Sequence, residues 1–111
     1  MYTLQSILGS ESSEQVLMFI LARSQGYPTE IADFYQVSKL PIQKQMAKLE
    51  TGSVLASHLV GRTRLYQFNP RYPFLKEVKA LLEKAFSFYP ESLQEELRMY
   101  RRRPRRAGKP L

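Results

Sequence analysis

The sequence predicts a mainly α-helical domain that contains one small β-hairpin, an α+β fold. Its 111 residues, 43% of them hydrophobic, suffice for a single modest core. Apolar residues recur with helical spacing in several segments. Between residues 54 and 68 the pattern changes to one typical of two short strands. The predicted order is therefore helix, helix, tight turn, helix, hairpin, helix.

The first long helix is expected from Ser12 to about Arg23. Ser12 and Gln15 have the spacing of a capping box, and a broad apolar face follows them. A short turn or helix before it should end at Gly9. The run Gly26-Tyr27-Pro28 breaks the pattern, and a second helix is expected to start at Thr29.

The third helix is expected from about Lys39 to Glu50, with Ser38 as its cap and Gly52 as a left-handed residue at its end. Pro41 is tolerable in the first turn, where the N–H groups lack acceptors within the helix. Two helices joined by so short a turn form a helix-turn-helix, whose second helix can enter the major groove of DNA.

A hairpin is predicted next, with strands Val54–Val60 and Arg64–Phe68 around Gly61-Arg62-Thr63. A last long helix should span about Pro73 to Tyr89, because apolar residues form a nearly continuous stripe there and Pro90 interrupts it. We expect this stripe to serve both the core and a homodimer interface. The interface residues expected on it are Leu75, Val78, Leu82, Phe86 and Tyr89.

Positive charge is concentrated in two places. The net charge is +7, and residues 98–111 contain seven basic and no acidic side chains, so residues 1–97 are balanced. We expect residues 1–97 to form the folded domain and residues 98–111 a disordered basic tail. Within the domain, residues 39–71 contain six basic side chains and one acidic one. Such a distribution suggests a surface that binds a polyanion. Considered by itself, the charge is explained equally well by a surface that is only exposed to solvent.

The predicted third helix and hairpin contain side chains suited to DNA. Gln can bond the adenine edge, and Lys reaches guanine acceptors or phosphates. Arginines at a hairpin tip can contact the DNA backbone or enter the minor groove. The candidate DNA-binding residues are Ser38, Lys39, Pro41, Gln43, Lys44, Lys48, Arg62, Thr63 and Arg64.

Residues 37–46, followed by Leu49, Glu50 and Gly52, resemble the recognition-helix signature of ArsR-type winged helix-turn-helix regulators. Residues 61–70 are similar to the wing that follows in such proteins. The resemblance covers about residues 7–90. It implies a three-helix core, a wing and a C-terminal dimerisation helix, and a homodimer that binds double-stranded DNA. In some similar regulators this domain precedes a nucleotidyltransferase domain.

Several classes of protein and site are excluded or disfavoured. Metal-sensing members of the ArsR type use Cys, or clusters of His and Asp, but this chain has no Cys and only one His, His58, and one Asp, Asp33. Neither a metal nor another cofactor is therefore expected. The chain lacks a Gly-rich phosphate loop and a Cys nucleophile, which disfavours an enzyme. No apolar run is long enough to cross a membrane and no secretory signal is evident, so we expect a cytoplasmic protein.

Two functions remain open. The first is a sequence-specific transcriptional regulator, expected to be a repressor, that binds duplex DNA as a homodimer. The second is a protein-interaction module with the same fold, such as an antitoxin-like partner of a nucleotidyltransferase. Basic residues on both the third helix and the hairpin favour the first, because a purely protein-binding domain would not require both.

Overall fold

A computed structural model describes residues 2–99 of the chain, and in them the predicted mainly helical architecture with one antiparallel hairpin is confirmed. The helices and strands, in chain order, are α1 (Gln5–Leu8), α2 (Glu11–Arg23), α3 (Pro28–Tyr35), α4 (Lys39–Thr51), β1 (Leu55–Val60), β2 (Thr63–Phe68), α5 (Leu75–Phe86) and α6 (Glu91–Met99). Helix α6 continues two residues beyond the predicted domain end at residue 97. Residues 100–111 of the predicted tail lie outside the described residues.

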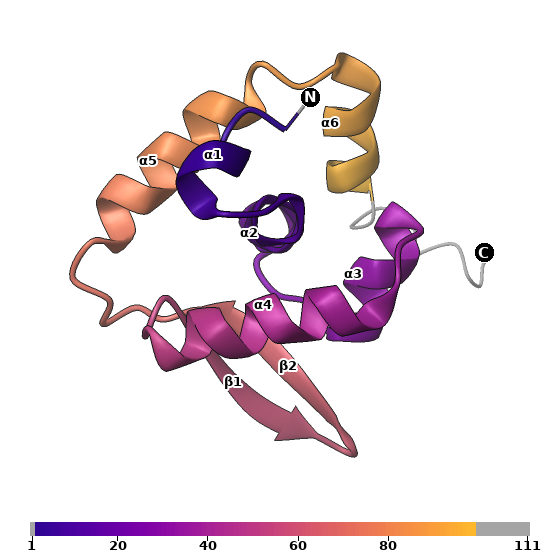
Figure 1. The fold of residues 1–111 in the computed structure, drawn as a ribbon, viewed down its shortest axis with the longest axis vertical. Coiled ribbons are helices and arrows are strands. Elements are labelled where there is room, and N and C mark those ends of the chain that lie inside the picture. The colour runs from indigo at the N-terminus through magenta and orange to yellow at the C-terminus, as the bar shows by residue number, and fades with distance from the viewer. Residues whose placement is uncertain (1, 100–111) are drawn as a thin grey trace.

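Helix α2 is the centre of the domain. Figure 1 shows it end-on, with α1, α5 and α6 around one side and α3 and α4 around the other. Every residue from 13 to 20 on it is buried, although its sequence contains Ser13, Glu14 and Gln15. The hairpin projects away from the body beyond α4 (Figure 1). This arrangement leaves α4 and the hairpin on the outside of the molecule.

The start of α2 differs from the prediction. Gly9 ends α1 in the left-handed conformation, with φ of 95°, and the chain then extends through Ser10. The Ser10 hydroxyl accepts a hydrogen bond from the Ser13 backbone N–H at 3.1 Å, so Ser10 is the cap. The predicted capping box of Ser12 and Gln15 is therefore wrong. The Gln15 amide instead donates to the Tyr2 hydroxyl at 2.9 Å.

The ends of α3 and α4 also deviate by a residue or so. Helix α3 begins at Pro28 and not at Thr29, because the first helical position loses nothing when its N–H is absent. Ser38 is the N-cap of α4, as predicted, but its side chain makes no capping hydrogen bond. The left-handed residue after α4 is Ser53, with φ of 70°, whereas Gly52 has φ of −83°.

The hairpin is tighter than predicted. Val60 pairs with Thr63, so only Gly61 and Arg62 form the loop, and Gly61 adopts the left-handed conformation that this turn requires. Gly26, in the connection between α2 and α3, exchanges two backbone hydrogen bonds of 2.9 and 3.0 Å with Tyr66. These bonds anchor the base of the hairpin beside the helix-turn-helix.

Gly26 can make this contact because it has no side chain. A β-carbon there would lie 2.9 Å from a ring carbon of Phe19, which is fully buried. The backbone of β2 and the aromatic core therefore approach the same position from two sides. This close approach fixes the hairpin relative to α3 and α4.

A buried polar cluster connects α2 to both ends of the domain. Glu14 is fully buried, and its two carboxyl oxygens accept hydrogen bonds from the Leu4 N–H at 2.9 Å and from the Tyr89 hydroxyl at 2.5 Å. Burial and the hydrogen bond to Glu14 both raise the pKa of Tyr89 above its usual value. Helix α5 ends at Phe86 and not at Tyr89 as predicted, and the turn that follows directs Tyr89 into the core.

Candidate nucleic-acid interface

Helix α4 presents one face to the core and one to the outside. Ile42 and Met46 are fully buried against the other helices. All six candidate DNA-binding residues of this helix and its cap are exposed: Ser38, Lys39, Pro41, Gln43, Lys44 and Lys48. The neighbouring Gln45 is half-buried and accepts a hydrogen bond of 2.6 Å from the Ser13 hydroxyl of α2, so it fixes α4 to the core.

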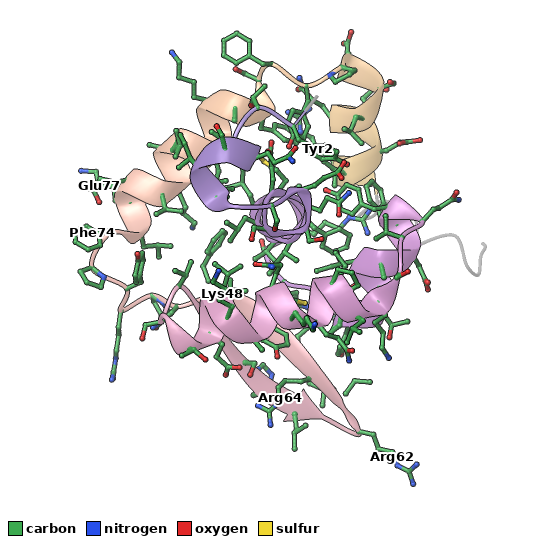
Figure 2. All side chains as sticks on the ribbon, viewed as in Figure 1. Tyr2, Lys48, Arg62, Arg64, Phe74 and Glu77 are labelled. Carbon is green, nitrogen blue, oxygen red and sulfur yellow. The ribbon has the colours of Figure 1, made fainter. Side chains whose placement is uncertain are left out.

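A groove of about 440 Å³ separates α4 from the hairpin. It brings together five of the nine candidate residues, namely Lys39, Gln43, Arg62, Thr63 and Arg64. The hairpin tip carries Arg62 away from the body of the molecule (Figure 2). Three cationic side chains and one amide thus border a single groove on the outside of the domain.

Sequence reasoning missed the rest of the groove lining. These residues come from the start of α3, from α4 and from the hairpin: Tyr27, Pro28, Thr29, Ala47, Leu59 and Tyr66. Their proximity depends on the bridge between Gly26 and Tyr66, which joins positions 40 residues apart in the chain. No local pattern in the sequence signals such a contact.

The other candidates on α4 lie outside this groove. Ser38 and Pro41 line a separate hollow against the first turns of α2, where Glu11, Ser12 and Gln15 face them. Lys44 and Lys48 are exposed one turn apart on the outer face of α4. A ligand that covered the outer face and entered the groove would therefore meet cations from both elements.

A chain of hydrogen bonds positions Arg64. Its guanidinium donates to the Ser57 hydroxyl at 3.0 Å, and that hydroxyl donates to the Glu50 carboxylate at 2.7 Å. Glu50, the only acidic residue of α4, thus binds to the hairpin, and α4 and the wing are connected through their side chains. Arg64 is held along the strand face, whereas Arg62 extends from the tip (Figure 2).

Thr63 has a structural contact of its own. Its hydroxyl donates to the Val60 carbonyl oxygen at 3.1 Å and closes the two-residue loop. A phosphate offers only acceptors, so this hydroxyl would have to leave Val60 to donate to one. Thr63 therefore borders the groove, but its hydroxyl hydrogen is already bonded to the Val60 carbonyl oxygen.

The residues expected at a dimer interface divide into two sets. Leu82, Phe86 and Tyr89 belong to the hydrophobic core of the chain itself, and Leu82 has no exposed surface. Their burial leaves them little or no surface for a second chain, because the 3.6-residue period turns this stripe toward α2. Val78 is half-buried against the same core, and Leu75 is half-buried.

Neither a metal centre nor a membrane span is present in the described part of the chain. Among residues 2–99 no group of three His, Cys, Asp or Glu side chains is placed to hold a metal ion, and His58 and Asp33 are both exposed. No helix in that range is long and apolar enough to cross a bilayer.

Comparisons with known proteins support the fold. No protein-family model matches the sequence, and neither does any curated protein. Solved structures do match. An apo double mutant of Lactococcus lactis ZitR superposes with a TM-score of 0.53 at 19% identity, over 89% of this chain and 83% of that chain. The adhesin competence repressor AdcR from Streptococcus pyogenes gives a TM-score of 0.54 at 16% identity, over 89% and 81%.

ZitR and AdcR are winged helix-turn-helix regulators of the MarR family, whereas the sequence resembles the ArsR type. At these identities the likeness concerns the fold. The predicted fold class is confirmed: the chain has a winged helix-turn-helix fold, with α3 and α4 as the helix-turn-helix and β1 and β2 as the wing.

Proposed function

We propose that the chain is a cytoplasmic, non-catalytic transcriptional regulator that binds specific sites in double-stranded DNA, with α4 in the major groove and the wing on the backbone or in the minor groove. The observation that carries the proposal is the groove between α4 and the wing, which Lys39, Arg62 and Arg64 border together with Gln43. Cations at such a groove can neutralise phosphates, and the amide can bond a base edge.

Two further points support this proposal. The similar structure AdcR is named a repressor, and we propose the same action for this chain. The ArsR-like pattern of residues 37–46 and of the wing at residues 61–70 agrees with a DNA-binding role, and we propose the ArsR type as the finer assignment.

Fluorescence anisotropy with labelled duplex DNA tests the proposal. The full chain is titrated with a random-sequence duplex and with a duplex from the region upstream of its own gene, across a salt series. We expect tighter binding to the upstream duplex that persists at physiological salt. Deleting residues 100–111, which follow α6, separates the contribution of the basic C-terminal residues.

Two results would contradict the proposal. One is equally weak binding to both duplexes that disappears when residues 100–111 are removed. The other is absence of binding by the full chain. Either would favour the protein-interaction module, for which a nucleotidyltransferase partner is the candidate.

We propose in addition that the chain is a homodimer through the outer flank of α5. Three large apolar side chains recur at intervals of seven residues along α5 and just past its ends: the N-cap Phe74, 59% exposed, Leu81 within the helix, 40% exposed, and Phe88, two residues beyond the last residue of the helix, 70% exposed. Figure 2 shows Phe74 at the outer edge of the molecule, with Glu77 close by. An interval of seven keeps residues of a helix on one side, so Leu81 continues the side on which the N-cap Phe74 stands.

The charges beside this flank are complementary to a second copy. In an antiparallel pair of α5 helices centred on Leu81, Phe74 of one copy would lie at the same end of the pair as Phe88 of the other. Glu77 and Lys84 lie four residues before and three residues after Leu81, so they also face each other across the two-fold axis. A self-complementary surface of this kind suits an isologous dimer.

Charge exchange on α5 provides the prediction. Glu77→Lys alone and Lys84→Glu alone should each convert the dimer to monomer, and the double exchange should restore it. Size-exclusion chromatography with light scattering measures the mass. Glu83→Lys, on another side of α5, is the matched control and should leave the dimer intact. A monomeric wild-type chain, or a dimer that is indifferent to both single changes, would contradict this interface.

A further inference from the structure

The outermost face of α4 is not uniformly polar. Leu40 is 60% exposed in the first turn of the helix, and Ala47 is exposed two turns later. With Lys44 they form a row at spacings of four and three residues, opposite the buried Ile42 and Met46. A single exposed leucine is ordinary on a small domain, so the meaning of this one depends on what surrounds it.

The surroundings of Leu40 define the chemistry of that partner. Lys39 and Lys44 lie beside it on α4, and Arg62 and Arg64 stand across the groove. A surface on which an apolar side chain lies among cations is complementary to a polyanion that also exposes apolar groups. The major groove of duplex DNA does so, because the C5-methyl group of each thymine projects into it between two phosphate backbones.

The position of Leu40 in the helix agrees with this partner. A recognition helix contacts base edges mainly through its N-terminal residues, and Leu40 is the second residue of α4. Gln43, less than one turn further on, supplies the donor and acceptor that adenine requires. Ala47 lies about 10 Å beyond Leu40 along the helix axis, at 1.5 Å per residue, and so can reach a different base pair.

We propose that α4 reads A·T pairs through the thymine methyl groups, with Leu40 and Ala47 as the apolar contacts and Gln43 as the partner of an adenine. The proposal rests on the proposed function and specifies the class of site recognised. RNA duplexes lack this signal, since uracil has no methyl group and the major groove of A-form RNA is too narrow and deep for side chains to read.

The experiment removes the methyl group without changing base pairing. A random duplex library is enriched by repeated capture on the full chain, and the enriched pool is then synthesised with either thymidine or deoxyuridine. Competition anisotropy compares the two pools. We expect enrichment of A·T pairs and binding about fourfold weaker for each contacted methyl group that is lost.

Protein variants connect the methyl group to Leu40. Leu40→Ala should weaken binding to the thymidine pool and leave binding to the deoxyuridine pool nearly unchanged, so that the ratio of the two affinities falls toward one. Ile7→Ala is the matched control, because Ile7 is 69% exposed but lies on α1, away from α4. It should leave the ratio at the wild-type value.

The possible failures are distinguishable. Equal affinity of the wild-type chain for both pools overturns the inference and leaves DNA binding in place. Equal weakening of both pools by Leu40→Ala overturns the role of Leu40 and is the result expected if that residue acts only on the fold. No weakening of either pool also overturns it and is the result expected if Leu40 contacts only a protein partner. Failure to capture any duplex overturns the proposed function together with this inference.

Discussion

Replacing Glu14 with Ala should lower the free energy of unfolding by about 2–6 kcal/mol, because two buried donors would lose their acceptor at once. These donors are the Leu4 N–H and the Tyr89 hydroxyl, which bond to Glu14 at 2.9 and 2.5 Å. A small domain has about 5–15 kcal/mol of stability in total, so this one change removes a large share of it. Urea unfolding followed by far-ultraviolet circular dichroism provides the measurement.

Matched variants identify the cause of that loss. Glu11→Ala changes an exposed carboxylate in the first turn of the same helix and should cost about 0.5 kcal/mol, the size of a favourable helix-dipole interaction. Tyr89→Phe removes only one of the two partners of Glu14 and should have an intermediate effect. In the combined Glu14→Ala, Tyr89→Phe variant the costs should be less than additive, because the hydroxyl has already been removed. A loss below about 1 kcal/mol for Glu14→Ala would show that the cluster is not essential to the fold.

Replacing Arg62 and Arg64 together with Ala should weaken duplex DNA binding about tenfold or more at physiological salt and reduce the slope of log K against log salt by about 2. Each phosphate contact releases counterions from the DNA on binding, so a variant with fewer contacts releases fewer of them. The slope of log K against log salt therefore reports the number of phosphate contacts. The measurement is the same anisotropy titration across a salt series.

A control with equal charge change distinguishes contact from general attraction. Arg71 and Lys76 are exposed but do not line the groove, and their combined replacement with Ala removes the same two charges. We expect this pair to change the slope much less. Equal effects of the two pairs would mean that the wing acts only through net charge, and the geometry proposed for the interface would then be wrong.

The sequence predicted the elements of the fold but not the contacts between distant ones. Helical period and turn residues are local properties, and they placed α2, α3, α4 and the hairpin within about two residues. The cap at Ser10 was missed because Ser12 has an equally good local pattern, and only the left-handed Gly9 decides between them. The outward residues of α4 were identified because burial of Ile42 and Met46 determines the opposite face.

The sequence could not predict two contacts of the candidate site, nor which surface the apolar stripe of α5 covers. The bridge between Gly26 and Tyr66 completes the groove, but Gly26 has the appearance of an ordinary helix breaker. The bonds that position Arg64 pass through Ser57, a residue with no distinctive pattern. The apolar stripe on α5 was expected to serve two surfaces, yet the structure assigns Leu82, Phe86 and Tyr89 to the core of the chain itself.

The partners of Glu14 have a consequence for the order in which the protein can fold during synthesis. Leu4 leaves the ribosome before Glu14, but Tyr89 is made 75 residues after it. A nascent chain can therefore already contain α2, α3, α4 and the wing while Glu14, at the centre of the domain, still lacks the hydrogen bond from the Tyr89 hydroxyl. The helix-turn-helix and the wing are thus not an autonomous module that could mature early. The second partner of Glu14 arrives with the connection between α5 and α6, and packing around α2 is completed only when α6 itself emerges.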